Sequence, residues 1–213
     1  MFWKGRPTAV KTIIRSEPIR WMIERSTFIA QVIRFPSSQL LPDVLTDIRS
    51  QYPDATHYVY AYRISEREEK GTDDGEPSGT AGLPVLRTLS THNAVESLAF
   101  VIRYFGGIKL GHGGLVRAYQ KSAQMAVEVA SWGTLVDGWR VTVRFPYTWA
   151  NIFDRHLRPA VYDLTMNFTD TITATCIVPQ AVWSDWWQDA INRTAAQIHL
   201  QSQEAVEFVR SKS

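Results

Sequence analysis

An apolar run that leads into a glycine-rich segment and then into a helical pattern constrains this chain more than any other feature. The apolar run covers residues 98–105 and is interrupted only by Arg103. Glycine fills five of the nine positions from 106 to 114, and a helical pattern begins at about Leu115. A strand, a glycine loop and a helix in this order aim free backbone N–H groups at whatever the loop holds. The sequence therefore predicts an anion site, with a purely structural turn as the competing interpretation.

Three cations accompany the predicted loop. Arg103 either reaches solvent at the end of the sheet or is paired, Lys109 lies within the loop, and Arg117 falls in the expected first helical turn. A cation in a first turn is unfavourable against the helix dipole, and a bound anion would remove that penalty. We therefore predict phosphate or a nucleic-acid backbone as the ligand. The predicted anion- or nucleic-acid-binding residues are Arg103, Gly106, Gly107, Lys109, Gly111, Gly113, Gly114 and Arg117.

The loop fits neither of two common phosphate-binding motifs. It contains no Walker A sequence, and Val116 stands where a dinucleotide fingerprint needs its third small residue. Tyr104, Phe105 and Tyr119 offer possible base stacking, although we expect them in the core.

A second candidate cluster lies in the polar segment 65–79, which we expect to be an exposed loop. Asp73, Asp74 and Glu76 are suited to binding Mg²⁺ or to acid–base chemistry, or are simply solvated. We expect them to lie close to residues 106–114. His57 and His112 are possible proton carriers, although we expect His57 to pack in a sheet and His112 to fill a variable loop position. Neither a nucleophile–base pair nor a metal-ligand spacing is recognisable, so no metal and no cofactor is predicted.

Composition limits the class of protein. The net charge of +2 over 213 residues argues against a polybasic nucleic-acid binder, although residues 1–34 carry a net +5 that forms either a basic edge or scattered solvated charges. The cations of that segment are Lys4, Arg6, Lys11, Arg15, Arg20, Arg25 and Arg34. Cys176 is the only cysteine, so neither an internal disulfide nor a cysteine metal cluster can form. Without a run of about 18 apolar residues, we expect a soluble cytoplasmic protein with no membrane contact.

The periodicity predicts an α+β protein of two domains, residues 1–135 and 136–213. Strand patterns occur in residues 9–34 and 56–64, helices follow from residues 37–38 and from Thr80 as N-cap, and residues 133–137 form the boundary. The second half reads as strand, helix, strand, strand, helix and strand, the split βαβ arrangement. Its helices are expected over residues 147–157 and from about Pro179, where tryptophans form an apolar stripe. Cys176 is expected in the core.

Two long motifs resemble the signature of the Impact/YigZ family. They are DDGEPSGTAGLPVL at 73–86 and RYFGGIKLGHGGLVRAY at 103–119, supported by ERSTFIA at 24–30 and YPDATHYVYAY at 52–62. Residues 139–208 are similar to the small C-terminal domain of bacterial members. The resemblance implies an N-terminal domain like domain 2 of ribosomal protein S5. It also implies a ferredoxin-like C-terminal domain like the last domain of elongation factor G.

The resemblance further implies a role in translation regulation. Eukaryotic members compete for the co-activator of a starvation-responsive kinase, through contacts that also need another domain, so that mechanism is not expected to carry over. We therefore hypothesise a non-enzymatic protein that contacts RNA, the ribosome or a translation factor through the 73–119 surface. One alternative is a Mg-dependent enzyme that acts on a phosphorylated small molecule, with Asp73, Asp74 or Glu76 as metal ligand or base. The other is an adaptor that binds only protein; the oligomeric state is left open.

Overall fold

A computed structural model describes residues 10–211 and contains two compact units. The first holds residues 10–134 with Ser211, and the second holds Leu135–Arg210. The first unit contains β1 (Val10–Arg15), β2 (Ile19–Ile23), β3 (Ser26–Arg34), the short turn η1 (Ser38–Leu40), α1 (Leu41–Gln51), β4 (His57–Ser65), β5 (Glu68–Thr72), α2 (Gly82–Thr91), β6 (Ser97–Tyr104), α3 (Gly111–Glu128) and the start of β7 (Ser131–Phe145). Both units are mixed α/β with antiparallel strand pairs.

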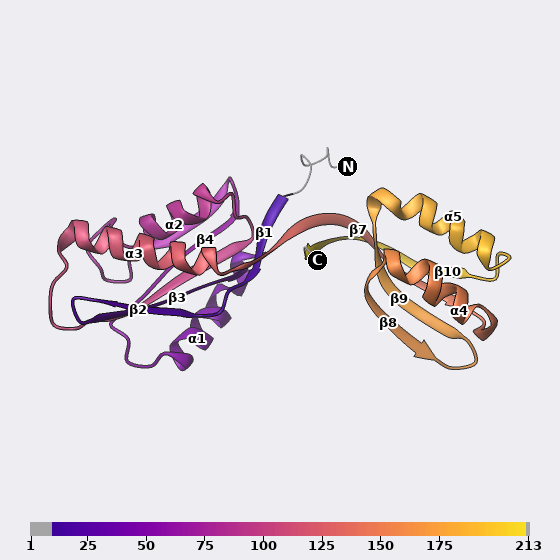
Figure 1. Cartoon of the computed structure of the whole chain (residues 1–213), viewed down its shortest axis with the longest axis horizontal. Helices are drawn as coiled ribbons and strands as arrows, with labels where there is room; N and C mark the ends of the chain where they lie inside the picture. The colour runs from indigo at the N-terminus through magenta and orange to yellow at the C-terminus, as the bar shows by residue number, and fades with distance from the viewer. Residues whose placement is uncertain (1–9, 212–213) are drawn as a thin grey trace. The chain divides into compact units, whose positions relative to one another are not determined.

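The sheet of the first unit is arranged around β6. Its strands follow the order β5-β4-β6-β3-β1, with β2 also pairing with β3. Helices α2 and α3 lie on one face and α1 lies on the other (Figure 1). Val101 therefore packs in the cluster beneath α2 and α3, while Ile102 packs in the cluster with Ile48 of α1. Coverage of both faces explains why β6 is a nearly continuous apolar run.

Three local predictions for the first unit are wrong. Strand β6 ends at Tyr104, and α3 begins at Gly111 rather than at about Leu115. The glycine loop is therefore shorter than predicted, and its last glycines belong to the helix. The polar segment 65–79 is not all loop, because Glu68–Thr72 forms β5 and pairs with β4. An exposed edge strand needs no apolar alternation, which is why its sequence looks like a loop.

The second unit has the predicted order of elements. After β7 come the turns η2 (Tyr147–Trp149), α4 (Ala150–Ile152), η3 (Phe153–Leu157) and η4 (Arg158–Ala160), then β8 (Tyr162–Phe168), β9 (Ile172–Pro179), η5 (Gln180–Val182), α5 (Trp183–Arg193) and β10 (His199–Ser211). The strand order is β10-β7-β9-β8. The helix expected over 147–157 is instead a series of 3-10, α and π turns.

The core of the second unit is apolar. Phe145 and Phe153 stack at 4.9 Å between ring centroids, and Trp186 is buried in the same cluster. Trp183 and Trp187 are partly buried against it, so the tryptophan stripe contributes to the core as predicted. Cys176 is fully buried, and burial raises the pKa of its thiol to about 12.

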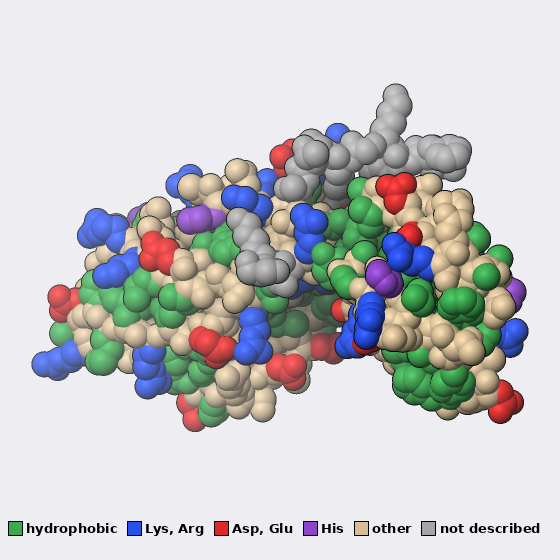
Figure 2. Space-filling model, turned by 45° about the vertical axis from the view of Figure 1, so that its right-hand side comes forward, with side chains coloured by type: hydrophobic (Ala, Val, Ile, Leu, Met, Phe, Trp, Pro, Cys, Tyr) green, Lys and Arg blue, Asp and Glu red, His purple; other side chains and the backbone are tan. Residues whose placement is uncertain are grey.

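Cations are distributed rather than gathered on the visible surface. Figure 2 shows Lys and Arg side chains interspersed with Asp and Glu over the face in view. Lys4 and Arg6, two members of the predicted basic edge, lie outside the described residues. Among the helices of residues 10–211, none has the length and hydropathy needed to span a bilayer.

Candidate functional site

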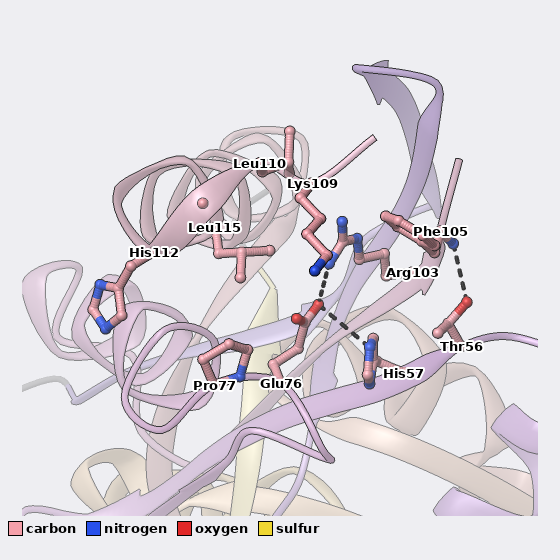
Figure 3. A pocket seen from close by; sticks show the side chains of 11 residues that line it. Thr56, His57, Glu76, Pro77, Arg103, Phe105, Lys109, Leu110, His112 and Leu115 are labelled. Carbon is pink, nitrogen blue, oxygen red and sulfur yellow. Dashed lines mark hydrogen bonds and ion pairs between the residues drawn. The ribbon is translucent and has the colours of Figure 1, made fainter. Parts of the chain in front are cut away.

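A pocket of about 380 Å³ lies in the first unit beside the start of α3. It is lined by Thr56, His57, Glu76, Pro77, Arg103, Phe105, Lys109, Leu110, Gly111, His112 and Leu115. The floor is buried, with Glu76 and Arg103 side chains only 4% and 5% exposed. The rim, which includes Phe105, Lys109 and His112, is exposed. The pocket therefore joins a polar, desolvated floor to an accessible edge (Figure 3).

The carboxylate of Glu76 is the centre of the floor. Its Oε1 accepts one hydrogen bond from Nη1 of Arg103 at 2.6 Å and another from the Tyr119 hydroxyl at 2.7 Å. Burial, and then the bond to Glu76, raise the pKa of Tyr119, so its hydroxyl stays a donor. A buried charge needs such partners, because an unpaired one would cost several kcal/mol.

Arg103 is held on all sides. Its guanidinium lies 5.4 Å from the ring centroid of Phe28 and 5.3 Å from that of Phe105. Nη2 donates to Oγ of Ser26 at 3.2 Å, while the buried Nε has no partner among the described residues. Of the two alternatives for Arg103, pairing is thus the correct one.

His57 opens β4 and faces Glu76 across the floor. Its Nδ1 lies 2.7 Å from the carbonyl oxygen of Asp74, which can only accept, so Nδ1 carries the proton. Nε2 lies 3.7 Å from Oε1 of Glu76, too far for a hydrogen bond. In the neutral imidazole this nitrogen is consequently an acceptor at the pocket floor.

The connection from β6 to α3 is shaped by glycine. A Cβ at Gly106 would lie 2.0 Å from the carbonyl carbon of Arg25, so only glycine fits beneath the β2–β3 turn. Gly107 has a φ of +86°, which disfavours other residues. The N–H groups of Phe105 and Gly106 donate to Oγ1 of Thr56 and Oγ of Ser26. These bonds fix where α3 starts relative to the pocket.

The first turn of α3 is open towards the pocket. No side chain caps it and it contains no acidic residue. Gly111 and His112 of that turn line the pocket, and Lys109 precedes them. Gly113 and Gly114 belong to the same turn but do not line the pocket. Unpaired N–H groups and the helix dipole make this end favourable for an anion.

The predicted position of Arg117 in the first helical turn is wrong. Arg117 is the seventh residue of α3, beyond the first turn where the sequence pattern placed it. A Cβ at Gly113 would lie 3.4 Å from its Nη1, and Arg117 does not line the pocket. Of the three predicted cations, only Arg103 and Lys109 meet there, and Arg103 is already paired with Glu76.

The acidic cluster is not simply solvated. Asp73 accepts backbone N–H bonds from Gly79, Ala81 and Gly82, at 2.8, 2.9 and 2.8 Å. Burial raises the pKa of Asp73, but these bonds outweigh it and hold that pKa below its usual value. Asp73 therefore caps α2, the role that Thr80 was expected to fill.

The three carboxylates of the acidic cluster have separate partners. Oδ2 of Asp74 accepts from the N–H of Tyr58 at 2.6 Å, and only Glu76 reaches the pocket. Glu76 shares that pocket with Lys109, as the expected closeness to residues 106–114 requires. Within residues 10–211, no group of three or more His, Cys, Asp or Glu side chains is placed to hold a metal ion.

Sequence reasoning favoured structural places over site roles for three residues of this site. His57 was expected in the sheet, whereas Phe105 and Tyr119 were expected in the core. Phe105 is 45% exposed at the rim, and Tyr119 is buried but donates to Glu76. A buried tyrosine hydroxyl needs an acceptor and a buried arginine needs an acid, so the sequence could have indicated an acidic partner for Tyr119 and Arg103 without identifying it as Glu76.

The chain is similar to several known proteins. The Impact N-terminal domain family matches residues 24–127. The chain is similar to an Impact family member of Thermus thermophilus, 39% identical over 126 residues, covering 59% of this chain and 68% of that one. It is 48% identical over 103 residues to YvyE of Bacillus subtilis, covering 47% of this chain and 48% of that protein. The chain thus spans about half the length of the Bacillus relative. A crystal structure described as a hypothetical protein shares the fold, with a TM-score of 0.60 at 24% identity over 92% of this chain and 98% of that one.

Proposed function

Because the chain belongs to the Impact family, as its resemblance to Impact/YigZ members predicted, we propose that it is a non-enzymatic RNA-binding protein that acts in translation. Its pocket beside α3 would hold a phosphate group of single-stranded RNA. The family resemblance supports the setting in translation, and the chemistry of the pocket supports the ligand.

The observation that carries this proposal is the open first turn of α3. Its N–H groups lack a capping side chain, and Lys109, two residues before Gly111, lies on the rim of the same pocket. Backbone N–H groups of a helix start bind phosphate well, and a nearby lysine adds a mobile charge.

The charges of the pocket favour an anion at its α3 side. Glu76 and Arg103 neutralise each other in a 2.6 Å pair. Lys109 and the positive end of the α3 dipole are then left to attract the ligand. One lysine and one helix end supply few phosphate contacts, so binding should be weak, sensitive to salt and tolerant of sequence.

A titration with fluorescent single-stranded RNA at two salt concentrations tests the proposal. The variant Lys109→Ala should weaken binding and flatten the log–log salt slope by about 0.7, the value for one lost phosphate contact on a single strand. Lys11→Ala is the matched control, because Lys11 is exposed on β1 and does not line the pocket. Affinity that is unchanged by Lys109→Ala would contradict RNA binding at this pocket. Absence of any RNA binding, with a translation factor captured instead, would favour the protein-only adaptor.

We also propose that the two units are the two domains that the family resemblance implies. The β10-β7-β9-β8 order supports a ferredoxin-like domain over residues 136–213, like the last domain of elongation factor G. Residues 1–135 would form the domain like domain 2 of ribosomal protein S5. A fragment of residues 131–213, which contains all of β7, should then unfold cooperatively by itself.

A further inference from the structure

Two unused hydrogen-bond acceptors lie on the pocket floor, whereas the start of α3 offers hydrogen-bond donors. Oε1 of Glu76 is occupied by Arg103 and Tyr119, whereas Oε2 receives no hydrogen bond from the described residues. In the neutral imidazole with the proton on Nδ1, Nε2 of His57 is the second acceptor, and Oε1 of Glu76, which faces it at 3.7 Å, offers no proton. A ligand that offered only phosphate would give neither acceptor a donor and would place a carboxylate near the anion.

From these acceptors we infer that the pocket takes a ribonucleotide with a free 2′,3′-diol, an inference that rests on the proposed function. The two ribose hydroxyls donate to Glu76 and His57, while the 5′-phosphate lies at Lys109 and the first turn of α3. Figure 3 shows Glu76 and His57 close together across the floor and Lys109 descending from the rim. The ligand thereby satisfies acceptors at one side of the pocket and donors at the other.

The size and rim of the pocket fit a single nucleotide. Its volume of about 380 Å³ lies near the lower end of the range for small-molecule sites, about 300–1,000 Å³. Phe105 covers the guanidinium of Arg103 and is 45% exposed, which leaves ring surface for a base. Aromatic side chains stack on bases with little dependence on sequence.

The diol identifies a chain end or a free nucleotide. In the interior of RNA the 3′ oxygen belongs to a phosphodiester and cannot donate, so only the 3′-terminal residue offers both hydroxyls. DNA lacks the 2′-hydroxyl and a 3′-phosphate blocks the other position. The same chemistry occurs in 5′-AMP, and the experiment separates these two sources.

The test compares 12-nucleotide RNAs that differ only at the 3′ end, with the wild-type chain. The ends are a ribose diol, a 2′-deoxyribose, and a 3′-phosphate, and unlabelled 5′-AMP serves as a competitor. Loss of the 2′-hydroxyl bond to the neutral His57 should weaken binding about two- to tenfold for the deoxy end, and loss of the 3′-hydroxyl bond to the Glu76 carboxylate at least about tenfold for the 3′-phosphate. These ligand changes leave protein folding untouched.

A protein variant locates the effect. In His57→Ala, the ratio of affinities between the diol and deoxy ends should fall towards one, whereas His112→Ala, which alters a rim histidine, should preserve the ratio. Competition by 5′-AMP but not by 5′-dAMP supports the inference with a free nucleotide as ligand. Diol-dependent RNA binding without such competition supports it with an RNA end.

Two outcomes overturn the inference, and only the second also rejects the proposed function. Equal affinity for all three RNA ends, with the Lys109→Ala effect intact, rejects the diol but keeps phosphate binding. No binding of RNA or of 5′-AMP rejects both the diol and the proposed function.

Discussion

The first unit and the second unit differ in the side chains that they bury. Between residues 10 and 134, the first unit buries four charged side chains, Arg63, Glu76, Glu96 and Arg103. In the second unit Thr194 is the only buried residue of polar type among those that the structure describes. Buried ion pairs add little net stability over apolar packing, since desolvation offsets their attraction. Of these four, Glu76 and Arg103 line the pocket, and we infer that the first unit keeps this pair for binding, whereas the second unit is packed for stability.

The largest expected effect comes from breaking the pair at the pocket floor. Glu76→Ala leaves the Arg103 guanidinium buried without its 2.6 Å partner and removes the acceptor of Tyr119. Breaking a buried pair from one side typically costs about 3–5 kcal/mol of the free energy of unfolding. Urea denaturation followed by tryptophan fluorescence measures it. The double variant Glu76→Ala, Arg103→Met should recover part of the loss; if it is no more stable than Glu76→Ala, the charge is not the cause.

The next prediction concerns the second unit, where a substitution adds a polar group to the apolar core. Cys176 is fully buried in the cluster of the second unit. Cys176→Ser introduces a hydroxyl without a designed partner and should cost about 1–3 kcal/mol. Cys176→Ala is the control, because it removes the sulfur without adding a polar group. A serine variant as stable as the alanine variant, by the same denaturation, would show that this core tolerates polarity and would weaken the comparison.

The helix cap supplied by Asp73 makes the stability of the first unit depend on pH. Asp73→Ala removes the acceptor of three backbone N–H groups and should cost about 1 kcal/mol, within a range of about 0.5–2. The pKa of Asp73 is lowered in the folded state, so its contribution is full above the unfolded value of 3.8. That contribution is lost as pH falls through the lower folded value. The difference between wild type and variant should shrink below pH 3.8, and a constant difference down to pH 2 would contradict the cap.

Sequence patterns predicted the apolar parts of this molecule better than its polar parts. The strand β6, the order of elements in the second unit and the burial of Cys176 follow from local periodicity, which needs no knowledge of contacts. Glu76 and Arg103 are 27 residues apart, and their pairing depends on how the chain brings them together. A single sequence carries no local signal for such a pair.

The start of α3 shows the same limit at short range. Gly113 and Gly114 have low helix propensity, so the pattern seemed to begin at Leu115, the first apolar residue of the face. Tertiary contacts at Gly106 and the pocket fix the true start at Gly111. Because Arg117 was placed by that pattern, the error in the helix start carried over to the predicted site.

The smallest expected effect comes from breaking an exposed ion pair of the second unit. Asp154 and Arg158 lie one helical turn apart at 2.6 Å, the same distance as Glu76 and Arg103, but both side chains are 58% exposed. Solvent screens an exposed pair and ordering two long side chains costs entropy, so Asp154→Ala should change the free energy of unfolding by only about 0.3–0.5 kcal/mol. Raising the salt concentration should remove most of that difference, whereas it should leave the effect of Glu76→Ala nearly unchanged. If Asp154→Ala costs as much as Glu76→Ala, burial is not what separates the two pairs, and the contrast between the two units loses its basis.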